Sequence, residues 1–336
     1  MQDADGSKSG GAPTQVGPYR IVTSVAAGGM GTVYLAKAPQ PDGTELQIAL
    51  KVLHPQHAQD EDVARRFVDE GRVGARIAHP NVVAVLDAGQ VNGTSYLALE
   101  YVHGDTLSSL LRASVAEERM VPLPIVSSIL LDLLAGLHAA HEVVDENGEP
   151  LGIVHRDVSP QNILVDLEGR AFISDFGVAK VKDSLRTTRS GTMIGKAGYM
   201  APEQLVGAVV NARTDLYASG ILLWECLAGK RLFSGVEDQI QAVVARRTQP
   251  RVKTLRPDVP DEIDQLVAEV LEHAPEDRPQ SAFEISSRLR RSIPRASRSE
   301  VGAWVKSLVG DRLAERQRLA DLLDEEEEET DRKSVV

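Results

Sequence analysis

The 336-residue sequence has one cysteine and lacks any apolar run that reaches the length of a membrane span. Cys226 therefore cannot form an internal disulfide, which fits a reducing compartment. Apolar runs such as 221–224 end well short of the roughly 20 residues that a membrane helix needs. The first 17 residues are polar, rich in Gly and Ser, and have no apolar centre of a signal peptide. We expect a soluble, cytoplasmic protein without a membrane partner, and disorder over 1–17.

Positive charge is also scarce, with 37 Lys and Arg against 49 Asp and Glu and a net charge of −12. Residues 321–336 hold eight acidic and two basic side chains, so this tail alone carries −6. Nucleic-acid binding depends on neutralising phosphates, so we expect no nucleic-acid partner. An apolar content of 42% over this length supports a large core and two or three domains or lobes.

One stretch, 153–164, places Asp157 five residues before Asn162 in a loop between apolar runs. Pro160 restricts the backbone between them. A second apolar run ends at Asp175, in the triplet Asp-Phe-Gly. One base and two oxygen ligands for Mg²⁺ are the groups that phosphoryl transfer to a hydroxyl needs. Alone, the spacing does not identify an enzyme.

Alternating apolar and polar residues over 19–53 predict β-strands. Within them, Gly28, Gly29 and Gly31 form a glycine-rich turn that lets backbone N–H groups approach phosphates. An ordinary hairpin would have the same residues. Lys51 lies in an apolar strand, where an unpaired ammonium is unfavourable, although strand lysines are commonly exposed on an edge.

The rest of the chain is mainly helical in pattern. We predict a helix over 60–78, strands over 82–86 and 96–101 joined by a turn at Asn92-Gly93, and a long helix over 123–142. Residues 180–196 are polar and rich in hydroxyls, and we expect a mobile segment there. Further helices are expected near 201–206, 213–228, 236–246, 261–271 and 282–291.

The motifs occur in an order that resembles the Hanks-type protein Ser/Thr kinases, especially their bacterial branch. The resemblance covers roughly 19–293. It is carried by Ala26-x-Gly28-x-x-Gly31-x-Val33, Ala49-Leu50-Lys51, Glu70, His155-Arg156-Asp157 to Asn162, Asp175-Phe176-Gly177, Ala201-Pro202-Glu203, Asp215, and Arg278 in Asp-Arg-Pro.

The resemblance implies an α+β, bilobal protein-kinase-like fold with a small β-rich N-lobe and a larger helical C-lobe. It divides the chain into a disordered segment at 1–17 and a kinase domain at 18–293, with an N-lobe at 18–102 and a C-lobe at 103–293. A helical extension at 294–323 and a disordered acidic tail at 324–336 follow.

The resemblance also implies the cofactors ATP and Mg²⁺ and protein substrates. Asp157 would be the catalytic base, and Asn162 and Asp175 would hold the metal. Lys51, paired with Glu70, would contact the α- and β-phosphates. The ATP site would be formed by Val25, Gly28, Gly29, Gly31, Val33, Ala49, Lys51, Glu70, Glu100, Val102 and Leu164, with Leu99 behind the adenine. Glu203 and Arg278 resemble a structural ion pair.

Arg156 precedes the catalytic Asp, and in the family such an arginine often binds a phosphate on the activation segment. Thr188 and Ser190 align best with the usual sites, and Thr187 and Thr192 are alternatives. We expect autophosphorylation there, with self-association for transfer between copies. Ordinary surface hydroxyls are the other interpretation.

Four positions depart from the family pattern. Ala26 replaces a glycine of the loop, a change of one methyl group. Gly74, one turn after Glu70, stands where a larger apolar side chain is usual, and with Gly71 it should loosen the helix so that the Lys51–Glu70 pair forms only partially.

The other two departures are read together. Ser159 stands where Ser/Thr kinases usually have a lysine, and Lys196 stands where they usually have a threonine. We interpret this as an exchange, in which Lys196 brings its charge beside Asp157 and Ser159 supplies the hydroxyl. The alternative is two unrelated substitutions that impair catalysis.

Beyond 293 the resemblance weakens. Val301, Trp304, Val305 and Leu308 have helical spacing and predict a helix that docks on the helical lobe, or else binds a partner. The run 324–329 is expected to be a solvated tail. An active Ser/Thr kinase is the first functional hypothesis, and an ATP-binding pseudokinase scaffold is the alternative.

Overall fold

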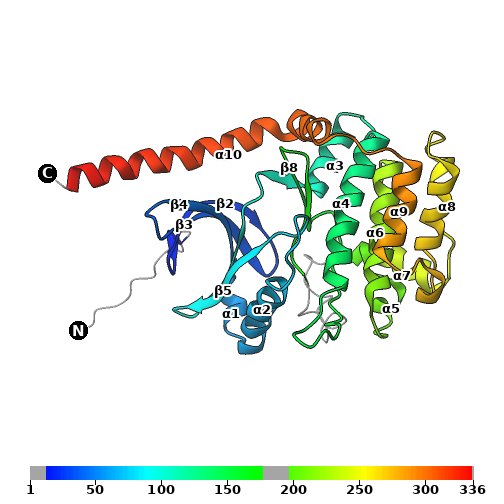
Figure 1. The fold of residues 1–336 in the computed structure, drawn as a ribbon, viewed down its shortest axis with the longest axis horizontal. Coiled ribbons are helices and arrows are strands. Elements are labelled where there is room, and N and C mark those ends of the chain that lie inside the picture. The colour runs from blue at the N-terminus through cyan, green and yellow to red at the C-terminus, as the bar shows by residue number, and fades with distance from the viewer. Residues whose placement is uncertain (1–12, 177–196, 335–336) are drawn as a thin grey trace, which may run out of the picture.

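A computed structural model describes residues 13–176 and 197–334. Figure 1 shows a sheet with helices beside it, joined to a larger body of packed helices. The expected bilobal α+β fold is confirmed. Residues 1–12 of the N-terminal segment, and the whole of the segment 180–196, lie outside the described residues.

The smaller lobe is an antiparallel sheet with the order β1-β2-β3-β4-β6-β5. Its strands are β1 Gln15–Val16, β2 Tyr19–Ala27, β3 Gly31–Pro39, β4 Glu45–Leu53, β5 Val85–Val91 and β6 Thr94–Glu100. Two predictions were wrong in detail. Residues 15–16 pair with β2 instead of being disordered, and β5 begins three residues after the expected 82 and runs to Val91. The turn at Asn92-Gly93 is confirmed, with both residues at positive φ.

Helix α2, Glu61–Gly74, packs against β5 and β6. It begins at Asp60, whose carboxylate accepts the N–H groups of Asp62 and Val63. The prediction that it continues to 78 was wrong, because the helix ends at Gly74. A Cβ at Gly71 would lie 2.4 Å from the Leu97 side chain, so this glycine is required for close packing on β6. Whether the glycines also loosen the helix stays a prediction.

The larger lobe is helical and contains a small sheet with the order β7-β8-β9. Its elements are β7 Gly104–Thr106, α3 Leu107–Ala116, α4 Leu123–His141, β8 Ile163–Asp166, β9 Ala171–Ile173, α5 Pro202–Leu205, α6 Ala212–Ala228, α7 Val236–Val244, α8 Asp261–Val270, α9 Ala282–Ser292 and α10 Arg298–Ser334. The short helix α1, Pro55–Ala58, belongs to the smaller lobe and lies beside α2 in Figure 1.

Helix α4 is apolar on nearly every side and forms the centre of the helical-lobe core. By length and composition it could cross a membrane, contrary to the expectation that every apolar run is too short. Its apolar window is 72% buried inside the fold, which is the pattern of a core helix. Cys226 on α6 is also in this core, where burial raises the pKa of its thiol to about 12.

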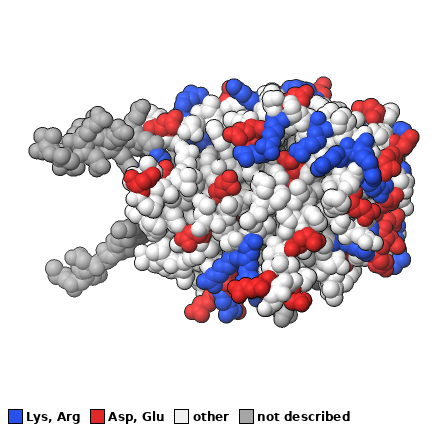
Figure 2. All heavy atoms as spheres, in the orientation of Figure 1, with Lys and Arg blue, Asp and Glu red and all other residues white. Residues whose placement is uncertain are grey.

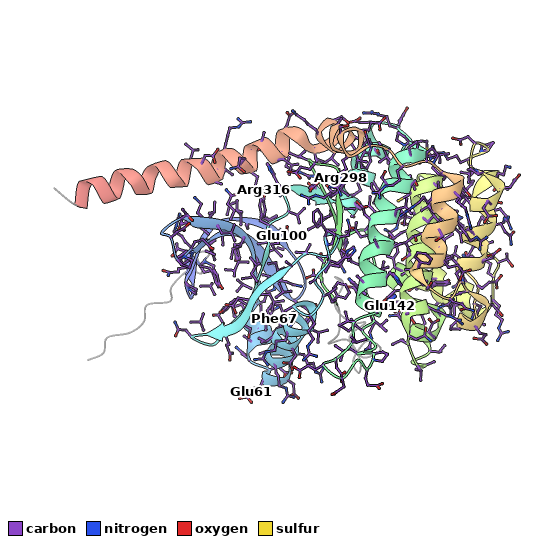
Figure 3. The ribbon with its side chains drawn as sticks, in the orientation of Figure 1. Glu61, Phe67, Glu100, Glu142, Arg298 and Arg316 are labelled. Carbon is purple, nitrogen blue, oxygen red and sulfur yellow. The ribbon has the colours of Figure 1, made fainter. Side chains whose placement is uncertain are left out.

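Helix α10 continues to Ser334, so the disorder predicted for 324–336 was wrong over 324–334. Its first half docks on the helical lobe as expected, with Val301, Trp304 and Val305 in the core. Arg312 donates to Ser109 Oγ at 2.7 Å and pairs with Asp105, just after the connection between the lobes. Figures 1 and 3 show α10 then running on past Arg316 toward the smaller lobe, where it lies beside β2.

The first turn of α10 contacts the β8–β9 turn through backbone. A Cβ at Gly302 would lie 2.2 Å from the Leu167 carbonyl oxygen. We therefore expect Gly302→Ala to lower the free energy of unfolding by roughly 1–3 kcal/mol. The reason is that the new methyl group would clash with backbone atoms, which cannot move aside as a flexible side chain can. Chemical denaturation of the full chain measures this value.

Gly310→Ala is the matched control on the same helix. A Cβ there would meet only the flexible Lys306 side chain, at 3.2 Å. Alanine favours a helix by up to about 1 kcal/mol over glycine, so this variant should be equally or more stable. Equal losses in both variants would contradict the docking of α10 on the β8–β9 turn.

Charges of both signs share the face shown in Figure 2. Acidic side chains gather at the end of the helical lobe where α8 lies, with Lys and Arg beside them. Ion pairs there join Arg251 to Asp264 and Arg288 to Glu262. On this face, acidic and basic side chains thus lie next to one another.

Candidate functional site

Hydrogen bonds to Asp215 of α6 hold the loop that carries Asp157. Both oxygens of the Asp215 carboxylate accept backbone N–H groups, from His155 and from Arg156, each at 2.8 Å. His141 of α4 lies 2.8 Å from the same carboxylate. Arg156 has φ +64°, a left-handed conformation that a non-glycine residue keeps only where the surroundings impose it. The surrounding hydrogen bonds thus fix the backbone immediately before Asp157.

His155 joins this loop to the segment of Asp175. Its Nε2 lies 3.0 Å from the Ser174 carbonyl oxygen and must donate, while its Nδ1 accepts the Asp157 N–H at 3.2 Å. Burial lowers the pKa of His155, although Asp215 and Asp157 oppose the shift. The ring is therefore neutral at pH 7, in the one tautomer that makes both bonds.

Asp157 and Asn162 are in direct contact. The Asn162 side-chain amide donates to the Asp157 carbonyl at 2.8 Å and to its carboxylate at 3.0 Å. Among the described residues nothing donates to Asn162 Oδ1, so this oxygen can accept a cation. The contact orients the Asp157 carboxylate and leaves one amide oxygen beside it.

Asp175 is brought to the same place by the β8–β9 hairpin. The Ser174 N–H donates to the Asn162 carbonyl at 2.9 Å, directly before Asp175. Asp175 has φ +60°, a second strained non-glycine residue in the site. Its carboxylate accepts a hydrogen bond from Lys51 Nζ at 2.7 Å, across the boundary between the lobes.

Lys51 is on β4, opposite Val33 of β3 and Leu97 of β6. Burial disfavours the ammonium, but Asp175, Glu70 and Asp157 outweigh it and raise the pKa of Lys51. Its Nζ lies 5.8 Å from the Phe67 ring centroid of α2, a neighbour that sequence reasoning missed; Figure 3 marks Phe67 on that helix. Lys51 thus forms an ion pair with Asp175, and the predicted pairing with Glu70 stays a prediction.

The glycine-rich turn joins β2 to β3. Gly28, Gly29 and Met30 are exposed, and the Gly28 N–H donates to the Gly31 carbonyl at 2.9 Å. A Cβ at Gly31 would lie 2.3 Å from the Val52 carbonyl oxygen, so only glycine fits there. Val25 lies at an irregularity of the β2–β3 pairing, half-buried, just before the turn.

The residues expected around the adenine are brought together only in part. Leu99, Val102 and Leu164 pack in one apolar cluster. The cluster also contains Val83 and Phe172, which sequence reasoning missed because they belong to no motif. Ala49 pairs with Leu99, and Glu100 is exposed at the end of β6, where Figure 3 marks it. Among the described residues the Val102 N–H has no acceptor, so it can serve a ligand.

Ser159 is 1% exposed, and within the described ranges its Oγ has no hydrogen-bond partner. The buried Nε of Arg156 also has no hydrogen-bond partner within the described ranges. Lys196 lies outside the described residues, as do the candidate phosphosites Thr187, Thr188, Ser190 and Thr192. The proposed exchange of Ser159 and Lys196 therefore stays a prediction.

Comparisons with known proteins identify the family of the chain. A family model described as "Protein kinase domain" matches residues 19–288. The chain is 36% identical over 313 residues to "Tyrosine-protein kinase MasK" of Myxococcus xanthus, covering 91% of this chain and 48% of that protein. It is 34% identical over 276 residues to "Probable serine/threonine-protein kinase CPE1738" of Clostridium perfringens, covering 81% and 38%. The chain thus spans half or less of the length of these relatives.

A structural comparison gives the same fold. The crystal structure of the Mycobacterium tuberculosis PknI kinase domain matches with a TM-score of 0.63 and 28% sequence identity, covering 84% of this chain and 99% of that one.

Proposed function

Because the chain belongs to the protein kinase domain family, and specifically to its Hanks-type bacterial branch, we propose that it transfers the γ-phosphate of ATP to Ser or Thr hydroxyls of proteins. The observation that carries the proposal is the convergence of Lys51, Asp175, Asn162 and Asp157 through hydrogen bonds of 2.7–3.0 Å. Three elements far apart in sequence supply these groups.

ATP would lie between the lobes. Backbone N–H groups of the glycine-rich turn and the Lys51 ammonium would face the phosphates. Val25, Val33, Ala49 and Leu164 would enclose the adenine, and its edge would meet the Glu100 carbonyl and the Val102 N–H.

Mg²⁺ fits the donor set that the loop and Asp175 supply. The structure has no group of three or more His, Cys, Asp or Glu side chains in its described part that could hold a metal. Mg²⁺ needs no such cage, because it keeps several waters and binds one or two protein oxygens together with phosphates. The Asn162 amide oxygen and the Asp175 carboxylate would hold it, and when bound it would neutralise charge on the phosphates.

Transfer would use Asp157 as the base. Its carboxylate, oriented by Asn162, would accept the proton of the substrate hydroxyl as that oxygen bonds to the γ-phosphorus. The bond to the ADP oxygen breaks, and the electron pair leaves with ADP. Lys51 would stabilise the phosphate charge from the opposite lobe.

Incubation of the purified chain with γ-labelled ATP and a mixture of proteins tests the proposal. We expect label on Ser and Thr that disappears when EDTA removes Mg²⁺ and in Asp175→Asn. Label found only on Tyr would overturn the proposal that Ser and Thr hydroxyls are the acceptors. Nucleotide binding without transfer would instead establish the pseudokinase alternative.

The same assay tests regulation. Arg156 is proposed to bind a phosphate on the activation segment, and its buried Nε lacks a described partner. We expect phosphate on at least one of Thr187, Thr188, Ser190 and Thr192, placed there by a second copy of the kinase in the cytoplasm. Unmodified peptides from an active preparation would contradict this.

The Ser159/Lys196 exchange predicts strong coupling between two substitutions. Ser159→Lys and Lys196→Thr should each lower kcat, while the double variant regains activity, with a coupling of roughly 1–3 kcal/mol. The reason is that the pair would again supply one ammonium and one hydroxyl. Steady-state kinetics of the four proteins measures the coupling, and a double variant far less active than either single one would rule out the exchange.

A further inference from the structure

Two histidines, His57 on the short helix α1 and His54 at its N-cap, contact the glycine-rich turn. His57 Nε2 lies 2.9 Å from the Gly29 carbonyl oxygen. His54 Nε2 lies 3.0 Å from Thr32 Oγ1, and the His54 N–H donates to the Met30 carbonyl at 2.9 Å. The two rings are stacked, with centroids 6.5 Å apart. Three contacts from one helical turn therefore hold the tip of the loop and the start of β3.

The chemical nature of each group determines which atom donates the hydrogen bond. A carbonyl oxygen only accepts, so His57 Nε2 carries a proton and donates to Gly29. The Thr32 hydroxyl can either donate or accept, so its bond to His54 forms with either tautomer.

The contacts also orient the peptide planes of the loop. In a planar trans peptide the C=O and the following N–H point in opposite directions. The Gly29 and Met30 carbonyls both point at α1, so the N–H groups of Met30 and Gly31 point away from it. Two successive donors are thereby aimed to the same side, as a phosphate-binding turn requires.

An exposed turn of Gly28, Gly29 and Met30 would otherwise lose much conformational freedom when it closes on a ligand. We propose that His57 and His54 are positioning residues that hold the turn ready for the phosphates of ATP. The inference rests on the proposed function, because it assumes that ATP is the ligand. Since α1 packs against α2, the same contacts connect the turn to the helix of Glu70.

The test measures the Kd of the chain for ATP and for adenosine. The comparison distinguishes a loss of contacts to the phosphates from a loss of contacts to the adenine. In His57→Ala we expect the Kd for Mg-ATP to rise roughly five- to tenfold, the equivalent of one hydrogen bond. The Kd for adenosine should not change, because adenosine has no phosphates. In kinetics, the KM for ATP should rise more than kcat falls.

Rescue and control variants make the test specific. His57→Gln keeps an N–H donor and should restore much of the ATP affinity. Gln59→Ala, an exposed change at the end of the same helix, should have no effect. Thr32→Val removes the hydroxyl that contacts His54 without changing the side-chain shape, and it should weaken ATP binding several-fold.

Three results would overturn the inference. These are an unchanged Kd for ATP in both His57→Ala and Thr32→Val, an equal loss of ATP and adenosine affinity, or no rescue by Gln. A wild-type chain that binds adenosine but not ATP would overturn the proposed function itself, and so the two failures are distinguishable.

Discussion

Replacing Asp157 by Asn is expected to lower kcat for phosphoryl transfer roughly 10²- to 10⁴-fold while the Kd for ATP stays at the wild-type value. The amide has almost the same shape as the carboxylate. Its oxygen can still accept from the Asn162 amide, which lies 3.0 Å from the carboxylate in the native protein. The loop should therefore keep its conformation and lose only the base. Initial rates with saturating ATP measure kcat, and calorimetry measures the Kd.

The matched control is Asp42→Asn, which makes the same chemical change in an exposed turn far from the site. It should leave both constants unchanged. Loss of ATP affinity in Asp157→Asn equal to its loss of kcat would show that Asp157 supports the site structurally. A wild-type kcat in that variant would show that Asp157 has no catalytic role.

The sequence predicted the parts of the site that depend on local spacing. Asp157 and Asn162 are five residues apart on one loop, and the structure places them in contact. Lys51 and Asp175 are 124 residues apart, and only the resemblance to a family, not periodicity, could join them. Their direct pairing was not foreseen, because the family pattern directs attention to Glu70.

Packing accounts for most of what sequence reasoning could not show. From the sequence, Gly71 is a residue that weakens a helix; the structure adds that its lack of a Cβ leaves room for the Leu97 side chain. The acidic run after 323 reads as a solvated tail, yet glutamate is a good helix former and the run continues a helix that is already docked. His54 and His57 belong to no motif, and only the fold brings them to the glycine-rich turn.

Removing the Arg278 side chain is expected to lower the free energy of unfolding by roughly 3–5 kcal/mol, a large part of the stability of an average domain. Arg278 is 3% exposed and donates to both oxygens of Glu203, at 2.8 and 2.9 Å. It also donates to the carbonyls of Glu272 and His273. Arg278→Ala would leave the buried Glu203 carboxylate without a charged partner, with only the Thr214 hydroxyl still donating to it, and would remove the donor from these carbonyls. Chemical denaturation gives the loss.

Arg65→Ala removes a partner from the exposed Arg65–Asp62 pair and should change stability by less than about 0.5 kcal/mol. Arg278→Lys keeps the charge but not the planar fork, so an intermediate loss is expected. A loss in Arg278→Ala as small as that in Arg65→Ala would refute the structural role of the buried pair.

The same pair predicts a dependence on pH. Burial alone would raise the pKa of Glu203, but the hydrogen bonds and charge of Arg278, with the Thr214 hydroxyl, hold it below the usual 4.5. A carboxyl whose folded pKa is depressed contributes stability above its unfolded pKa and loses it as the pH falls through the folded value. Wild-type stability should therefore decline below about pH 4.5 more steeply than that of Glu203→Gln, which has no proton to gain at this position. Parallel pH profiles for the two proteins would show that Glu203 is not linked to acid unfolding.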